Sequence, residues 1–142
     1  ISLGYPEPDV ETGILYAQAQ RHPIDTLQPV LALAEVLELQ HAVRCVRVEQ
    51  SLGRYVVEIA DRTRSDARLK LGVSPRGSLM LFRSAQAAAL SAGRDYALPD
   101  DVQRMAPYVL AHRLVLTSKA KYSGVRKADV IAEILDGVRV PT

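Results

Sequence analysis

The sequence predicts a mainly α-helical protein, a bundle of about six helices joined by short extended connectors. Aromatic residues make up only 5% of the 142 residues, whereas alanine and leucine are abundant. This composition favours helices over a β-sandwich or barrel. Apolar residues also recur at helical spacing in several segments, which proline and glycine separate. With 48% hydrophobic and 24% charged residues, the chain is long enough to bury a core.

The first third of the chain predicts two helices. Residues 1–8 (ISLGYPEP) have the composition of an extended segment that ends in a proline-rich turn. A short helix is expected over about Asp9–Arg21, and a second one from Val30 to about Arg44, with a loop bracketed by Pro23 and Pro29. The following CVRVEQ alternates briefly, which indicates an extended connector or a very short strand.

The middle of the chain carries the clearest helical pattern. In SLGRYVVEIADRTR the apolar positions fall at i, i+3, i+4, i+7 and i+8, namely Leu52, Tyr55, Val56, Ile59 and Ala60. SDARLKLGV is then expected to be a polar loop. The next helix is expected from Pro75 to about Ala92, and small or apolar residues surround it almost completely. We therefore expect it to be the central and most buried helix.

Two further helices complete the predicted bundle. One has apolar positions at Val102, Met105, Ala106, Val109 and Leu110, although Pro107 should kink or restart it. RLVLTSKA is expected to be extended or irregular. The last helix should carry Val130, Ile131, Ile134 and Leu135 and end near Gly137.

Familiar catalytic motifs are absent from the sequence. It contains no G-x-x-x-x-G-K-[ST] loop, no G-x-S-x-G elbow and no H-E-x-x-H. The three histidines, His22, His41 and His112, lack metal-ligand spacing and are expected to be surface or structural residues. Asp100 and Asp101 fit the acidic first turn of a helix better than a metal or acid–base pair. No metal site is predicted, and the chain alone is not expected to be a complete enzyme.

The net charge and the single cysteine narrow the possible classes of protein further. A net charge of +2 is too small to indicate nucleic acid or an anionic membrane, although 14 of the 18 basic residues are arginine. Cys45 is the single cysteine, which excludes a disulfide framework, and its valine neighbours predict an inert, partly buried thiol. No apolar run could span a membrane, and no signal peptide precedes the acidic start. We expect a cytoplasmic setting and, since residue 1 is Ile, a piece of a longer protein.

One residue does not fit its local structure. In GVSPRGSLML, Ser74 can cap a helix and Pro75 suits its first position, which puts Arg76 in the first turn. The positive end of a helix disfavours a cation by about 0.3–1 kcal/mol. Arg76 is either an exposed or ion-paired surface residue that tolerates this position, or part of an anion site, where free N–H groups and a guanidinium together bind phosphate. The physics leaves both interpretations open.

The segment Gly72–Thr117 resembles the second-sensor region of MoxR-type AAA+ ATPases. That family reads G-A-S-P-R-A, a long helix, G-R-D-Y-V-x-P-x-D-V and A-P-x-V-L-x-H-R-L, and the opening ISLGYPEPDVE resembles its exit from the ATPase core. The resemblance extends to about Val140. This sequence departs from the family at Gly77 (usually Ala), at Leu98 (usually Thr) and in GVRKADV, which lacks the usual V-T-P-x-E cap.

The resemblance implies a lid that closes over nucleotide bound to a preceding ATPase core. Residues 1–8 would be the hinge or exit from that core, and residues 9–142 the helical lid domain. Arg76 would be the second-sensor arginine, which contacts the γ-phosphate of ATP. Gly4, Tyr5 and Pro6 would lie at the hinge near the adenine, and the His112–Arg113 pair would be structural. ATP and Mg²⁺ would belong to the parent protein, with none bound to this fragment, so the chain itself is expected to show no ATP turnover.

The family also implies partners. The parent would be a homo-hexameric, chaperone-like motor that works with von Willebrand factor A-domain proteins to mature other complexes or insert metal into them. One alternative is the lid of a chelatase-like AAA+ branch. Another is a stand-alone nucleic-acid-binding module with a basic stripe of Arg44, Arg47, Arg54, Arg62, Arg64 and Arg68. Interleaved acidic residues and the scarcity of aromatic residues count against it.

Overall fold

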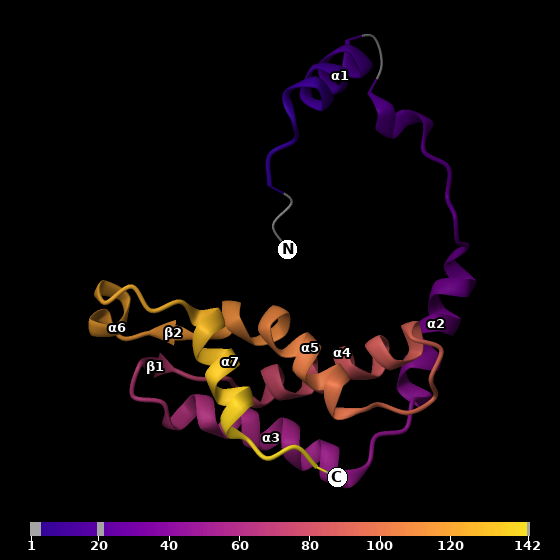
Figure 1. Cartoon of the computed structure of the whole chain (residues 1–142). Helices are drawn as coiled ribbons and strands as arrows, with labels where there is room; N and C mark the ends of the chain where they lie inside the picture. Colours follow the sequence, from indigo (N-terminus) through magenta and orange to yellow (C-terminus); the bar gives the residue numbers. More distant parts are fainter. Residues whose placement is uncertain (1–3, 20–21, 142) are drawn as a thin grey trace. The chain divides into compact units, whose positions relative to one another are not determined.

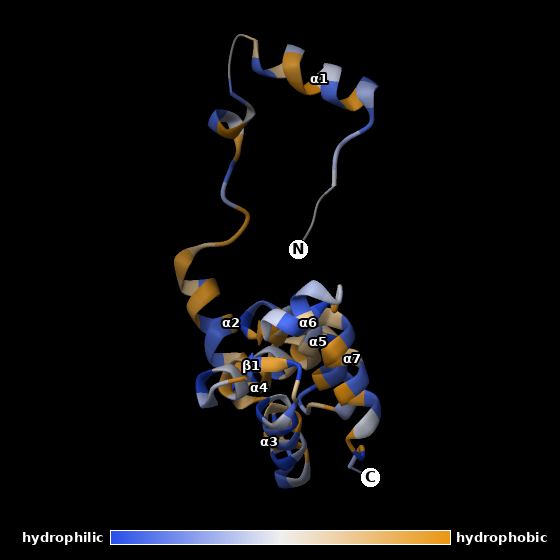
Figure 2. Ribbon diagram, turned by 90° about the vertical axis from the view of Figure 1, so that its left-hand side faces the viewer, coloured by the Kyte–Doolittle hydropathy of each residue, from blue (hydrophilic) through white to orange (hydrophobic). Residues whose placement is uncertain are grey.

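The computed structural model describes residues 4–19 and 22–141, and the chain divides into two compact units, Ile1–Leu37 and Glu38–Thr142. In the first unit, α1 (Pro8–Gln18) begins with proline and has acidic residues in its first turn, and the short 3-10 helix η1 (Pro23–Thr26) follows. No residue of α1 is buried, although the helix carries hydrophobic stretches (Figure 2). The first helix predicted from sequence is confirmed over Pro8–Gln18, and its expected end near Arg21 lies outside the described residues.

The second unit is built on four longer helices. After α2 (Leu33–Cys45), which crosses from the first unit, come α3 (Gln50–Ser65), α4 (Pro75–Ser91), α5 (Pro99–Leu110) and α7 (Lys127–Gly137). The helix α4 packs against α3 and α5, and α7 packs against the same two helices, as Figure 1 shows. The mainly helical fold class is confirmed, with seven α-helices in the described residues rather than about six.

The additional elements lie at one end of this unit. The strand β1 (Leu69–Leu71) pairs antiparallel with β2 (Val115–Leu116), and the five-residue helix α6 (Ser118–Tyr122) follows β2 (Figure 1). A 3-10 turn, η2 (Ala111–Arg113), joins α5 to β2. The polar loop expected over SDARLKLGV is therefore wrong in its second half, because Leu69 pairs with Leu116 some 47 residues later.

The core of the second unit forms where α3, α4, α5 and α7 meet. Its largest fully buried side chains include Ile59, Leu81, Leu110 and Ile131, one from each of these helices. The all-round burial expected for α4 is wrong, because Leu79 and Met80 are exposed while its small residues face α3 and α5. Pro107 lies inside α5 without ending it.

Two buried polar groups tie the helices together. The amide of Gln86, 3% exposed, donates a hydrogen bond to the backbone carbonyl of Val46 (2.7 Å), which joins α4 to the α2–α3 connector. The Tyr55 hydroxyl accepts one from Gln103 (3.0 Å) and so joins α3 to α5. Satisfied polar contacts of this kind fix how neighbouring helices are placed. Among the described residues, no helix is both long and apolar enough to cross a membrane.

Candidate functional site

The N-terminus of α4 carries the arginine singled out by the sequence. Ser74 is the N-cap residue, Pro75 occupies the first turn and no acidic residue lies in that turn. The side chain of Ser74 makes no capping hydrogen bond, and Arg76 is exposed. Within residues 4–19 and 22–141, no carboxylate or hydrogen-bond acceptor contacts the Arg76 side chain. An ion pair therefore does not explain this cation at the positive end of the helix, and its guanidinium is free to bind an anion.

The loop before α4 is clamped onto the last turn of α3. Thr63 is fully buried, and its hydroxyl donates to the carbonyl of Ala60 (2.6 Å) while it accepts the N–H of Val73 (2.8 Å). The Nε of Arg64 donates to the carbonyl of Val73 (2.8 Å). A Cβ on Gly72 would lie 2.6–2.7 Å from backbone atoms of Thr63 and Arg64. Only glycine allows so close an approach, which fixes where α4 begins and hence where Arg76 lies.

The first turn of α4 also contacts η2. Gly77 is buried, and a Cβ at this position would lie 2.6 Å from Cγ1 of Val73 and 3.4 Å from Cδ of Arg113. The Nε of Arg113 donates to the carbonyl of Val109 (2.9 Å), which holds its stem against this turn. The glycine that replaces the usual alanine of the family thus leaves room for these two side chains.

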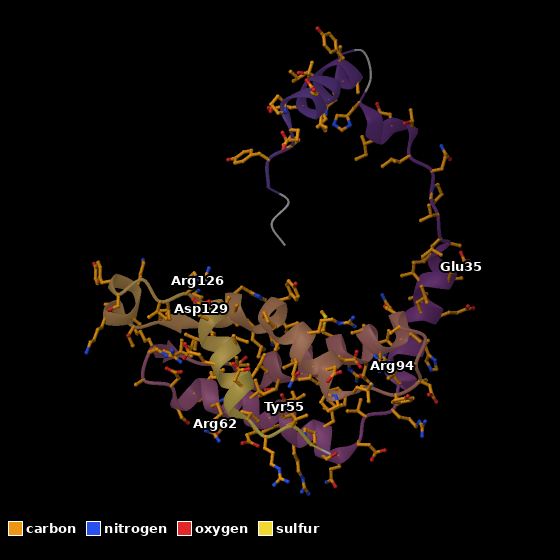
Figure 3. The ribbon with its side chains drawn as sticks, viewed as in Figure 1. Glu35, Tyr55, Arg62, Arg94, Arg126 and Asp129 are labelled. Carbon is orange, nitrogen blue, oxygen red and sulfur yellow. The ribbon has the colours of Figure 1, made fainter. Side chains whose placement is uncertain are left out.

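The stretch from Gly93 to Asp101 serves the fold rather than a ligand. Gly93, with φ at +75°, ends α4, and the N–H groups of Gly93 and Arg94 bond to the carbonyls of Leu90 and Ala89. The guanidinium of Arg94, labelled in Figure 3, then binds both carboxylate oxygens of Asp101 (2.8 and 2.7 Å). Asp101 also accepts the N–H of Leu98 (2.9 Å), which replaces the missing N-cap hydroxyl of α5.

Comparisons with known proteins agree with this arrangement. The model of the AAA lid domain family matches residues 61–134, slightly more than half of the chain. The chain belongs to the AAA lid domain family. A solved structure, described as a putative ATPase from Cytophaga hutchinsonii, superposes with a TM-score of 0.86 at 27% identity, covering 100% of this chain and 46% of that one.

The relatives place this lid in the MoxR type. The uncharacterized protein YeaC of Bacillus subtilis is 43% identical over 141 residues, which are 99% of this chain and 44% of YeaC. The chaperone MoxR1 of Mycobacterium tuberculosis is 35% identical over 150 residues, 99% of this chain and 39% of that protein. The lid spans less than half the length of these relatives. The resemblance to MoxR-type lids is confirmed.

The predicted hinge residues lie in the first unit. Gly4, Tyr5 and Pro6 lie before α1 in the first unit and are fully exposed, with φ of Gly4 at +68°. Residues 1–3, the rest of the predicted exit from the core, lie outside the described residues. Arg76 lies in the second unit, and the two units are described separately. The structure thus leaves the hinge role of Tyr5 and Pro6 a prediction.

The histidines are structural or exposed side chains. The ring of His22 accepts the N–H of Ile24 (3.2 Å), and Nδ1 of His112 lies 3.1 Å from the carbonyl oxygen of Tyr108. No three His, Cys, Asp or Glu side chains come together as metal ligands in the part of the chain that is described. The partial burial predicted for Cys45 is wrong: its thiol is exposed at the end of α2, 3.7 Å from Nδ1 of His41.

The basic stripe of the nucleic-acid alternative is largely neutralised. Arg62 pairs with Glu58 (3.5 Å) on the outer side of α3, and Arg47 pairs with Asp95 (3.3 Å). Arg68 binds Asp66 (2.7 Å) and also reaches Glu133 of α7 (2.6 Å). Because carboxylates engage Arg47, Arg62 and Arg68, the stripe does not present the continuous uncompensated positive charge that phosphate backbones require.

The pair of Arg94 and Asp101 is the strongest polar contact that sequence reasoning missed. The Asp101 side chain is only 3% exposed. Its burial opposes ionisation, but the hydrogen bonds from Arg94 and from the Leu98 N–H outweigh burial and lower the pKa of Asp101 below its ordinary value of 3.8. The sequence signal for this pair was Arg94, directly after the glycine that ends α4, followed seven residues later by Asp101 at the N3 position of α5.

We expect Asp101→Asn to lower the free energy of unfolding by about 2–3 kcal/mol at neutral pH, because Arg94 loses its carboxylate partner. Since the folded pKa of Asp101 is depressed, its contribution is present above about pH 4 and is lost as the pH falls through the folded pKa. Urea denaturation between about pH 3 and pH 7 should therefore show the two proteins converging at the acidic end. A constant difference across this range would contradict the assignment.

We expect Gly77→Ala to destabilise the lid by about 1 kcal/mol, although alanine is the better helix former. The new Cβ would lie 2.6 Å from Cγ1 of Val73, a buried side chain with little freedom to move. The double variant Val73→Ala/Gly77→Ala should lose less stability than the sum of the single variants, since Val73→Ala removes the obstacle. Additive losses in urea denaturation would show that Val73 is not the obstacle.

Proposed function

We propose that the lid senses nucleotide in a MoxR-type AAA+ ATPase and that Arg76 is its second-sensor arginine. One observation carries the proposal: an exposed arginine without a partner in the described chain, at the positive end of a helix whose start is clamped to α3. A cation kept at that position at an electrostatic cost has a reason to be there if an anion arrives from outside. We take this anion to be the γ-phosphate of ATP on a preceding core, and the match to the AAA lid domain family supports that choice.

The residues of this chain fit one part of such a site. Arg76 can bind phosphate oxygens through the two ends of its planar guanidinium, and lid movement can then distinguish ATP from ADP. Sequence and structure offer no phosphate-binding loop, and the described residues hold no cluster of carboxylates for Mg²⁺. Mg²⁺ and the other phosphate and base contacts are assigned to the core. We therefore expect this chain alone to bind ATP weakly and to show no turnover.

The wider role rests on the relatives. One of them is named a chaperone, and MoxR-type proteins recur among them. We propose a homo-hexameric, chaperone-like motor of the cytoplasm, in which residues 1–8, with Tyr5 and Pro6 near the adenine, form the hinge to the core and residues 9–142 form the lid. Proteins with von Willebrand factor A domains are the proposed accessory partners, and maturation of another complex, including metal insertion, is the proposed task.

The experiment that tests the nucleotide-sensing role is ATP hydrolysis by the full-length protein with and without Arg76→Ala. ATP affinity is measured alongside, so that binding and turnover are separated. Copurification of the full-length protein with its A-domain partner, by contrast, tests only the proposed motor. Loss of that partnership would leave the role of Arg76 untouched.

A further inference from the structure

A hollow beside the start of α4 gathers positive charge. It has a volume of about 670 Å³ and is lined by the end of α3, by the segment from β1 to α4 and by η2. Four of its lining residues are basic, namely Arg64, Lys70, His112 and Arg113. In the described chain, none of the residues that line it is Asp or Glu. Arg76 does not belong to the lining.

Both arginines that line the hollow are held in place by hydrogen bonds to backbone carbonyls. Arg64 bonds through Nε to the carbonyl of Val73 (2.8 Å), and Arg113 bonds through Nε to the carbonyl of Val109 (2.9 Å). In each side chain the Nε bond fixes the guanidinium plane and leaves the two terminal nitrogens for another acceptor. Within the described residues, Arg113 makes no ion pair and Arg64 makes one with Asp61, 3.8 Å from one of its terminal nitrogens, a distance too long for a hydrogen bond.

The other two basic groups differ. Lys70 is exposed, and no ion pair engages it in residues 4–19 and 22–141. In His112, Nδ1 lies 3.1 Å from the carbonyl oxygen of Tyr108. A carbonyl can only accept a hydrogen bond, so Nδ1 carries a proton and the ring is tied to α5. The hollow thus offers two guanidinium groups and one ammonium group to a phosphate.

The sequence around the hollow is rich in basic residues. Residues 67–94 and 102–128 contain eleven lysines and arginines but no aspartate or glutamate. All four lysines of the chain belong to these two stretches, which supply most of the lining of the hollow. Acidic residues outside these stretches pair with Arg68, Arg94, Arg104 and Arg126. In the part of the chain that the structure describes, no ion pair engages Lys70 or Arg113 of the lining.

We propose that this hollow binds a phosphate group, from a nucleotide or from free pyrophosphate. Planar guanidiniums match the paired oxygens of phosphate, and two positioned guanidiniums beside an exposed ammonium favour a ligand with at least two negative charges over a single carboxylate. The volume exceeds that of one phosphate and suits a diphosphate. The proposal does not depend on the role of Arg76.

The test is a titration of the 142-residue chain with inorganic pyrophosphate, ADP and succinate at a salt concentration of about 0.15 M, followed by NMR. Pyrophosphate should shift the amide signals of residues 72–74 and 113 saturably, with a Kd on the order of 0.1–1 mM. ADP binding as tightly as pyrophosphate indicates recognition of phosphate alone, and tighter ADP binding indicates a nucleotide ligand. Succinate should bind at least about tenfold more weakly, and succinate binding as tightly as pyrophosphate would overturn the proposal.

Three variants make the test specific. Lys70→Gln changes an exposed side chain, so it should fold normally and weaken pyrophosphate binding about threefold or more, and Arg113→Gln should weaken it about tenfold or more. Arg62→Gln, which removes an equal charge from the outer side of α3 (Figure 3), should change it less than twofold. Arg76→Ala should also leave it within about twofold. Loss of binding in Arg76→Ala, or full binding in Lys70→Gln, would overturn the proposal.

Discussion

Replacing Arg76 by alanine in the full-length protein is expected to lower ATP turnover about 10²-fold or more, equivalent to about 2.7 kcal/mol of transition-state stabilisation. Charge on the γ-phosphate oxygens must be stabilised as the phosphoryl group leaves, and a positioned guanidinium does so without reorganisation. Because Arg76 is exposed and makes no hydrogen bond or ion pair within the described chain, its removal should leave the stability of the lid almost unchanged. Removal of a cation from the first turn of α4 even favours the helix slightly.

The measurement compares kcat, KM and ATP affinity in the unchanged protein and in three variants, Arg76→Ala, Arg76→Lys and Arg62→Ala. Arg62→Ala is the matched control, since Arg62 is also a helical, exposed arginine but pairs with Glu58. Arg76→Lys keeps the charge and loses the planar fork, so its turnover should lie between those of Arg76→Ala and the unchanged protein. Assembly and folding are checked in each. Unchanged turnover and affinity in Arg76→Ala would mean that Arg76 is only a surface charge and that the motif records ancestry.

The sequence predicted the buried residues correctly in helices that bury a single apolar face. In α3 the predicted positions, Leu52, Tyr55, Val56, Ile59 and Ala60, are all buried. The helix α7 likewise buries Val130, Ile131 and Ile134, as its spacing predicted. In α4 the same reasoning overestimated burial, because Leu79 and Met80 remain exposed although Leu81 and the small residues are buried. Periodicity locates a helix, but only the packing of its neighbours decides which faces they cover.

The missed features are those that join distant segments. The pair β1–β2 has strands of only three and two residues, far apart in sequence, so neither shows an alternating pattern long enough to detect. The basic hollow similarly combines residues from α3, β1 and η2. The position of Arg76 in a first turn was predictable from the preceding Ser74 and Pro75, because capping is local chemistry. The anion that we propose for Arg76 could not be identified from local chemistry, because no residue near Arg76 in the sequence supplies it.

Replacing Gly72 by alanine is expected to destabilise the lid by about 3 kcal/mol. The new Cβ would lie 2.6 Å from the carbonyl oxygen of Thr63 and 2.7 Å from the backbone nitrogen of Arg64. Helical backbone cannot yield as a flexible side chain can, so the loop itself must move away from α3. Movement would break the hydrogen bond from the Val73 N–H to the buried Thr63 hydroxyl and leave that N–H without its acceptor. Strain and the lost hydrogen bond act in the same direction.

A second glycine provides the control. Gly53 lies within α3, and a Cβ added there would meet nothing within 4 Å. Gly53→Ala should therefore stabilise the lid by up to about 1 kcal/mol, since glycine is a poor helix former. Each variant adds the same methyl group to a glycine. A difference in their urea denaturation therefore reports how much room the new Cβ has at each position. Equal stability of Gly72→Ala and the unchanged chain would show that the loop is not clamped to α3.

The clamp also connects stability to function. Val73 immediately precedes the N-cap of α4, so a displaced loop would carry Arg76 away from its position. A displacement of about 1 Å in a phosphate contact is enough to cost about 10²-fold in rate. Full-length protein with Gly72→Ala should therefore lose turnover even at temperatures where it remains folded, whereas Gly53→Ala should keep it. Normal turnover in folded Gly72→Ala protein would show that the contact of the loop with α3 does not determine the position of Arg76. Contacts with the core would then fix that position.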